Sequence, residues 1–121
     1  MLFQKKIEGF GYAFSGIVIA WREEFNFRFH VLFGLATLAL AWIMHFSRIE
    51  FLIILGMIGL VLTAETFNTA LEELCDKFQP THDPHIAKIK DLAAGAVFIA
   101  SITAFIVGCI IFIPHFISLL W

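Results

Sequence analysis

The stretch that decides the fold is Phe51–Asp76, which reads FLIILGMIGLVLTAETFNTALEELCD. Its first part, Phe51–Ala64, carries no charge and is typical of a helix inside a membrane. The second part places a polar stripe about 80° wide on one helical face: Glu65, Asn68, Glu72 and Asp76. Ionisable groups at membrane depth usually mark a functional path or site. We therefore expect the polar stripe to form the active site; the alternative is a helix end whose acids simply reach water.

The composition is that of a membrane protein. Of the 121 residues, 60% are hydrophobic and 16% aromatic, and a soluble chain this short could not bury so much apolar surface. The chain is long enough for one domain at most. The formal net charge of −2 carries little information by itself, and no nucleic-acid partner is expected. Cys75 and Cys109 have neither a disulfide nor a metal-ligand spacing, so we expect two free thiols.

Hydrophobic periodicity predicts an all-α integral membrane protein with a single domain over residues 1–121. Residues 1–24 are expected to form an amphipathic helix in the membrane interface. Three transmembrane helices are expected to follow, over residues 25–46, 50–78 and 86–113. Pro114 is expected to end the last of them.

The segment 79–85 interrupts the helical pattern because it contains Pro80 and Pro84. His82 and His85 are close enough in sequence to be considered as a metal pair. A solvated loop fits them better, because two prolines interrupt the segment and two histidines alone do not complete a metal site.

The distribution of positive charge predicts the orientation. Seven of the eight basic residues flank the same ends of the predicted membrane helices, and only Arg48 lies on the other side. Lysine and arginine collect on the cytoplasmic side of membrane proteins. We therefore expect a multi-pass protein of the cell inner (plasma) membrane, with its N-terminus and its active site on the cytoplasmic side, where ATP is present.

Seven polar residues from three helices are expected to converge at one depth: Glu24, Glu65, Asn68, Glu72, Asp76, Lys90 and Asp91. Paired carboxylates from separate helices suit Mg²⁺, which completes its coordination shell with phosphate oxygens and water. A nearby lysine supplies a positive charge for phosphate, and a carboxylate at the lipid boundary can act as a general base. Together these groups indicate phosphoryl transfer to a lipid hydroxyl.

Two motifs sharpen this prediction: Glu65-x-x-Asn68-Thr69-Ala70-Leu71-Glu72-x-x-x-Asp76 and Lys90-Asp91-Leu92-Ala93-Ala94-Gly95-Ala96-Val97. Together they resemble the prokaryotic diacylglycerol kinase family of small integral-membrane lipid kinases, and the resemblance extends from Gly11 to about Pro114. The segment Glu24-x-Asn26-Phe27-Arg28-x-His30 is most similar to the Gram-positive branch, which is associated with undecaprenol kinase activity.

The resemblance implies a homotrimer whose sites are shared between neighbouring subunits, with Mg²⁺ as the cofactor and ATP as the co-substrate. Glu65 would be the catalytic base, with Asn68 positioning it, and Glu24 and Glu72 would hold Mg²⁺. The residues implied to bind nucleotide are Lys5, Tyr12, Glu24, Glu72, Lys90 and Asp91. The residues implied to contact the lipid are Trp21, Asn26, Arg28, His30, Glu65, Asp76 and Ala94.

Two alternatives accompany this hypothesis. Among lipid acceptors, we favour undecaprenol, which would give undecaprenyl phosphate, over diacylglycerol, which would give phosphatidic acid. From a different class, a non-catalytic membrane scaffold or an ion relay could also use an acidic stripe. A relay should carry polar groups along the full depth of the bilayer, whereas here they stop at one interface. The leading prediction is therefore an ATP-dependent lipid kinase.

Overall fold

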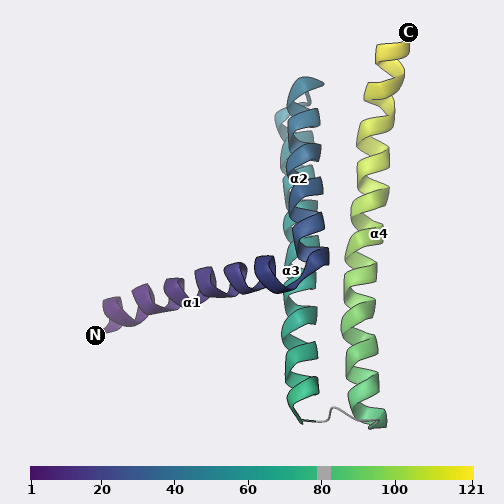
Figure 1. The fold of residues 1–121 in the computed structure, drawn as a ribbon. Coiled ribbons are helices and arrows are strands. Elements are labelled where there is room, and N and C mark those ends of the chain that lie inside the picture. Colours follow the sequence, from purple (N-terminus) through teal and green to yellow (C-terminus); the bar gives the residue numbers. More distant parts are fainter. Residues whose placement is uncertain (79–82) are drawn as a thin grey trace.

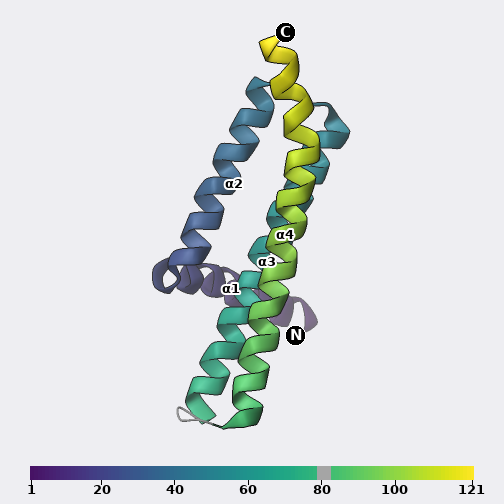
Figure 2. The same cartoon turned by 90° about the vertical axis from the view of Figure 1, so that its right-hand side faces the viewer.

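The computed structural model describes residues 1–78 and 83–121, and these form four helices in the order α1, α2, α3 and α4 (Figure 1). Their bounds are Leu2–Glu23, Phe25–Ile43, Arg48–Phe78 and Pro84–Leu120. The helices α2, α3 and α4 run alongside one another, whereas α1 projects sideways from them (Figures 1 and 2). The expected all-α architecture is confirmed.

Three of these helices, α2, α3 and α4, are long and apolar enough to cross a membrane. Most of their large apolar side chains are exposed, and the buried positions are few and mostly occupied by small or medium-sized residues. Apolar faces that point outward suit helices surrounded by lipid or by other chains. The chain is therefore a multi-pass membrane protein. The sideways direction of α1 suits a helix lying along the membrane surface, and that location stays a prediction.

The register of α3 against α4 follows from one polar contact near each end. Lys90 forms an ion pair with Asp76, and Nε2 of His115 lies 2.7 Å from Oε2 of Glu50. These contacts make the two helices antiparallel and place Glu65 level with Ala100. Ala100 is almost fully buried, as expected where a small side chain lets two membrane helices approach closely.

A tight turn joins α2 to α3. The amide of Phe46 donates to the carbonyl of Ala41, and His45 between them adopts a left-handed conformation with φ of 58°. This geometry is a Schellman motif, which ends a helix by satisfying its last carbonyls. It explains why α2 ends at Ile43 rather than at the predicted residue 46. Near the middle of α2, Gly34 is buried against Ile58 of α3.

The last helix corrects the sequence-based prediction. It runs from Pro84 to Leu120, so Pro114 lies inside it instead of ending it, and the predicted limits of 86 and 113 were too narrow. Proline removes one backbone donor and leaves the carbonyl four residues earlier without its usual partner. Ending a helix in an apolar environment would leave several backbone groups unsatisfied, which costs more.

The start of α4 lies within the predicted 79–85 linker. The carboxylate of Asp83 caps the helix by accepting hydrogen bonds from the amides of His85 and Ile86, and Pro84 occupies the first turn. His85 is therefore helical rather than part of a loop. Residues 79–82, including His82 of the considered metal pair, lie outside the described part of the chain.

Candidate active site

Glu65 is the carboxylate at the centre of the candidate site. It lies on α3 with only 6% of its surface exposed, and its Oε1 is 3.2 Å from Nε2 of His30 on α2. A buried carboxylate without a partner is costly, so the contact with His30 offsets part of that cost and fixes the orientation of the side chain. The sequence placed both residues in the site, and the structure brings them together.

One turn further along the same face, Asn68 and Glu72 form a second pair. Nδ2 of Asn68 donates a hydrogen bond of 3.2 Å to Oε1 of Glu72, which is the contact expected for helix positions four apart. Oδ1 of Asn68 is buried and has no hydrogen-bond partner among the described residues. Buried polar atoms are usually satisfied, so this oxygen is available to accept a hydrogen bond from a bound hydroxyl or to face a cation.

Glu24 joins the site from the junction between α1 and α2. Burial raises the pKa of its carboxyl, and the nearby charges of Glu72, Glu23, Glu65 and Glu73 raise that pKa further, in this order. Glu24 and Glu72, the two expected Mg²⁺ ligands, are therefore close enough to repel each other. Carboxylate oxygens are the donors that Mg²⁺ prefers, and a cation between them would relieve this repulsion.

The donor set for a metal ion is small. Among residues 1–78 and 83–121, no group of three or more histidine, cysteine or acidic side chains is gathered for a metal. Mg²⁺ needs only one or two carboxylates, because phosphate oxygens and water fill the rest of its shell. The pair Glu24 and Glu72 fits that requirement.

The polar stripe is longer than the single-depth cluster expected from the sequence. Asp76 is paired with Lys90 of α4, and it lies eleven residues from Glu65, or about 16 Å along α3. Asp91 and Ala94 are exposed in the same part of α4. The expected convergence at one depth was wrong: the polar stripe instead runs along α3 and contacts α2 at one end and α4 at the other.

Arg28, expected to contact lipid, has a clear role in the fold. Its Nη1 donates hydrogen bonds of 3.1 Å to the backbone carbonyls of Trp21 and Arg22, where the end of α1 leaves acceptors unsatisfied. Arg28 thus holds α1 at its angle to the bundle. Trp21 is partly exposed beside this turn, and Asn26 is exposed in the first turn of α2.

Lys5 and Tyr12, expected to bind nucleotide, lie on the exposed surface of α1. The N-terminal half of this helix extends away from the three membrane helices (Figure 1). Within one chain, these two residues are therefore not brought to the polar stripe.

Comparison with known proteins tests the expected family. Residues 11–112 match the family model described as prokaryotic diacylglycerol kinase. The chain belongs to the prokaryotic diacylglycerol kinase family. Its class of enzyme, a lipid kinase, follows from membership of this family and agrees with the prediction from the polar stripe.

Several relatives share most of this chain. A diacylglycerol kinase of Synechocystis is 38% identical over 92% of the chain, and the match spans 64% of that longer protein. An undecaprenol kinase of Bacillus subtilis is 36% identical over 88% of the chain and 87% of its own length. A diacylglycerol kinase of Escherichia coli is 29% identical over 94% of the chain and 93% of its own length.

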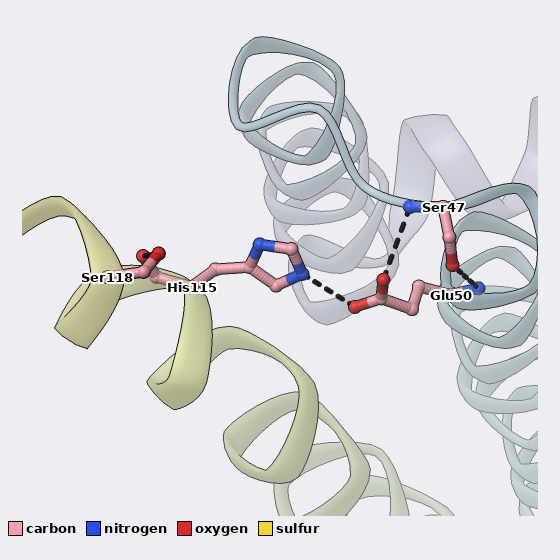
Figure 3. A network of polar contacts seen from close by, with 4 residues as sticks. All are labelled: Ser47, Glu50, His115 and Ser118. Carbon is pink, nitrogen blue, oxygen red and sulfur yellow. Dashed lines mark hydrogen bonds and ion pairs between the residues drawn. The ribbon is translucent and has the colours of Figure 1, made fainter.

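A polar network at the opposite end of the bundle was not predicted (Figure 3). The amide of Ser47 donates to Oε1 of Glu50, and the amide of Glu50 donates to Oγ of Ser47, both at 3.2 Å. The spacing Ser47-x-x-Glu50 is the sequence signal of such a capping box. The further contact of Glu50 with His115 has no local signal, since it depends on how α3 and α4 pack.

Proposed function

We propose that the protein transfers the γ-phosphoryl group of ATP to the hydroxyl of a membrane lipid, with Glu65 as the general base. The observation that carries this proposal is a buried carboxylate, oriented by His30, one turn from the Asn68–Glu72 pair. Membership of a lipid kinase family supplies the reaction class.

Each residue near Glu65 then has a task in the transfer. Glu65 takes the proton from the lipid O–H as the oxygen attacks the γ-phosphorus, and the bond to the leaving ADP breaks. The free Oδ1 of Asn68 faces the ligand, and its Nδ2 holds Glu72 in place. Mg²⁺, held by Glu24 and Glu72, would neutralise charge on the phosphates of the nucleotide.

The nucleotide is proposed to lie beyond Glu72, toward the cytoplasmic end of α3 and α4. Lys90 would provide a positive charge for phosphate after exchanging its partner Asp76 for the nucleotide, and Asp91 follows it on the same helix. Lys5 and Tyr12 would reach the nucleotide from a neighbouring subunit of a homotrimer. Support for this assembly comes from the position of α1, which keeps both residues away from the polar stripe of their own chain (Figure 1).

The proposed location is the inner (plasma) membrane, with the site facing the cytoplasm. Seven of the eight basic residues lie on the side of the polar stripe, which supports this orientation. The relay alternative is disfavoured because buried apolar side chains, including Ile54 and Val61, separate Glu65 from Glu50 along α3.

For the lipid acceptor, we propose undecaprenol, with diacylglycerol as the alternative. The Bacillus subtilis relative named undecaprenol kinase matches this chain over 87% of its own length, although relatives named diacylglycerol kinase match it too. Turnover of the two lipids by the purified protein, measured side by side in the same micelles, distinguishes the two acceptors.

Glu65→Gln tests the proposed base. The amide keeps the shape of the side chain but cannot take a proton, so lipid phosphorylation should fall by at least about a hundredfold, the usual contribution of a general base. Transfer of ³²P from labelled ATP to the lipid in mixed micelles measures the loss.

Glu73→Gln is the matched control, since Glu73 is exposed on the same helix. It should retain nearly full activity. Both variants should keep the wild-type elution volume in size-exclusion chromatography, which shows that their assembly is unchanged. Equal turnover by Glu65→Gln and the wild type would refute the assignment of the base.

A further inference from the structure

An apolar groove of about 530 Å³ is lined by residues of α2 and α4, with α3 as its floor. We call it the α2–α4 groove. Its walls are rich in aromatic rings, and small residues widen it on both sides. The lining residues used in the argument are His30, Ala104, Gly108, Phe112 and Phe116. Its volume is within the usual range for sites that bind small apolar molecules.

The α2–α4 groove leads to the candidate base. His30 lines the groove, and its Nε2 lies 3.2 Å from Oε1 of Glu65. The α3 residues that form the floor include Ile54, Ile58 and Val61. They precede Glu65 by 11, 7 and 4 positions, so they lie on the same face of the helix. The groove is thus the apolar continuation of the polar stripe, reaching about 16 Å from Glu65 to Ile54.

The far end of the α2–α4 groove is filled by aromatic rings. The ring centroids of Phe46 and Phe112 are 4.7 Å apart, and those of Phe112 and Phe116 are 6.2 Å apart. The ring of His115, which is stacked on Phe46 with centroids 4.2 Å apart, is fixed there by Glu50. The groove therefore has one polar end, at Glu65, and one aromatic end.

A second groove, of about 790 Å³, lies between α1, α2 and α3 but has no such connection. Its α3 residues include Gly59 and Thr63. On an ideal helix these positions point about 120° to 160° away from Glu65. Leu62, about 60° from Glu65, also lines this second groove, but His30 does not, so a molecule there would lack the path past His30 to the candidate base.

We propose that the α2–α4 groove binds the hydrocarbon tail of the lipid acceptor and that its aromatic end determines how much of that tail is held. This inference rests on the proposed function, since it places the hydroxyl of the lipid at Glu65. A tail in the groove replaces its contacts with surrounding lipid by van der Waals contacts with aromatic rings. It also holds the hydroxyl next to its base, which is the positioning that catalysis needs.

Three glycines allow a test with identical substitutions. An added Cβ meets nothing within 4 Å at Gly108, Gly59 or Gly56. Gly108 lines the α2–α4 groove and Gly59 lines the second groove. Gly56 lines neither of them and lies on the face of α3 opposite to Glu65. Gly108→Phe therefore fills the proposed tail site, Gly59→Phe fills the other groove, and Gly56→Phe controls for the added ring.

The length of the lipid tail provides the second variable. Gly108 is eight positions beyond the level of Glu65 on α4, which is about 12 Å along the helix. A long prenyl alcohol such as undecaprenol would pass it, whereas the short tail of geraniol would end before it. Gly108→Phe should raise KM for undecaprenol at least tenfold, with KM for geraniol and for ATP changed less than twofold. Gly56→Phe and Gly59→Phe should leave all three values near those of the wild type.

Three results would overturn the inference. The first is an equal KM for undecaprenol in Gly108→Phe and Gly56→Phe, and the second is a rise confined to Gly59→Phe. The third is a changed oligomeric state of Gly108→Phe in light scattering, which would make the groove an interface between copies of the chain. If the wild type phosphorylates neither these alcohols nor diacylglycerol, the proposed function itself fails and the inference with it. If it phosphorylates only diacylglycerol, the same variants are compared on long-chain and short-chain diacylglycerol, with the same expected contrast. Ala104→Phe, closer to Glu65 in the same groove, provides a second variant, which should also impair geraniol.

Discussion

Glu24 is the residue whose titration would report on the proposed Mg²⁺ site. Burial and the charges of Glu72 and its acidic neighbours raise the pKa of this carboxyl, so the folded protein favours its protonated form. The resulting stabilisation is complete below the ordinary pKa of glutamate and is lost as the pH rises through the raised value. Above that pH, the repulsion between Glu24 and Glu72 opposes folding unless a cation lies between them.

This titration predicts a pH dependence of magnesium binding. As the pH falls through the raised pKa of Glu24, the protonated carboxyl stops acting as a ligand, and the Mg²⁺ concentration for half-maximal activity should rise. Glu24→Gln should raise that concentration by about tenfold or more at neutral pH, given what even supporting residues contribute to metal affinity. Magnesium titrations of lipid phosphorylation at several pH values measure both effects.

In Glu24→Gln the half-maximal magnesium concentration should change less with pH than in the wild type. Glu23→Gln, on the exposed last residue of α1, keeps the proposed ligand but removes one of the charges that raise the pKa of Glu24, so its profile should keep its shape and move to lower pH. Parallel pH profiles for Glu24→Gln and the wild type would remove Glu24 from the metal site.

The sequence predicts which residues form the polar stripe on α3, but it does not predict which residues of α2 and α4 they contact. Helical periodicity alone places Glu65, Asn68 and Glu72 on one face, because the spacing is fixed by the geometry of one helix. The contact of Glu65 with His30 and that of Asp76 with Lys90 depend on the register between helices. No local pattern determines that register, so these two contacts could not be predicted from the sequence.

At the scale of the helices, two ends differ from the prediction for different reasons: α2 stops early at a Schellman motif, whereas α4 continues through Pro114. The caps at Ser47 and Asp83 follow ordinary sequence signals and mark where α3 and α4 begin. Pro114 carries an equally clear signal in a soluble helix, yet α4 continues through it. The apolar surroundings favour continued helix, since backbone groups there have no water to bind.

The packing of α2 on α3 depends on Gly34. A Cβ at this position would lie 2.9 Å from Cγ2 of Ile58, so Ile58 or the backbone would have to move. Replacing glycine by alanine inside a helix usually stabilises it by about 1 kcal/mol, whereas overpacking costs about 1–3 kcal/mol. We expect the overpacking to prevail, so that Gly34→Ala lowers the stability by about 1 kcal/mol.

Unfolding of Gly34→Ala in mixed micelles, followed by circular dichroism, measures this loss. Gly56→Ala is the matched control in α3, where an added Cβ meets nothing within 4 Å, and it should be as stable as the wild type or more so. Equal stability of the two variants would show that Gly34 is not needed for close approach of the helices.

At the scale of the whole molecule, the single chain leaves most of its apolar surface uncovered. α4 packs mainly against α3, and large side chains along α1, α2 and α4 are exposed. Composition predicts the membrane spans because their length must match the bilayer. It does not predict which faces touch a partner helix, since lipid and helix surfaces are equally apolar. The proposal of a homotrimer thus rests on the family resemblance and on the distance between α1 and the polar stripe.

Shared sites in a homotrimer predict that two inactive variants restore each other. Tyr12→Ala should lose nucleotide binding without loss of the fold, because Tyr12 is 77% exposed, and Glu65→Gln should lose the base. In trimers assembled from equal amounts of both, a site that takes Tyr12 from one subunit and Glu65 from its neighbour is intact in about a quarter of cases. Activity should therefore return to about a quarter of the wild-type value.

The measurement is phosphorylation by the two variants after they are unfolded, mixed and reassembled together in micelles. Each variant reassembled alone should stay inactive. A chain carrying both substitutions, mixed with Glu65→Gln, should also give no activity, because no intact Glu65 is then present in the assembly. If sites are instead formed within one chain, every subunit of the mixture carries one defect, and the mixed sample should be no more active than the separate variants.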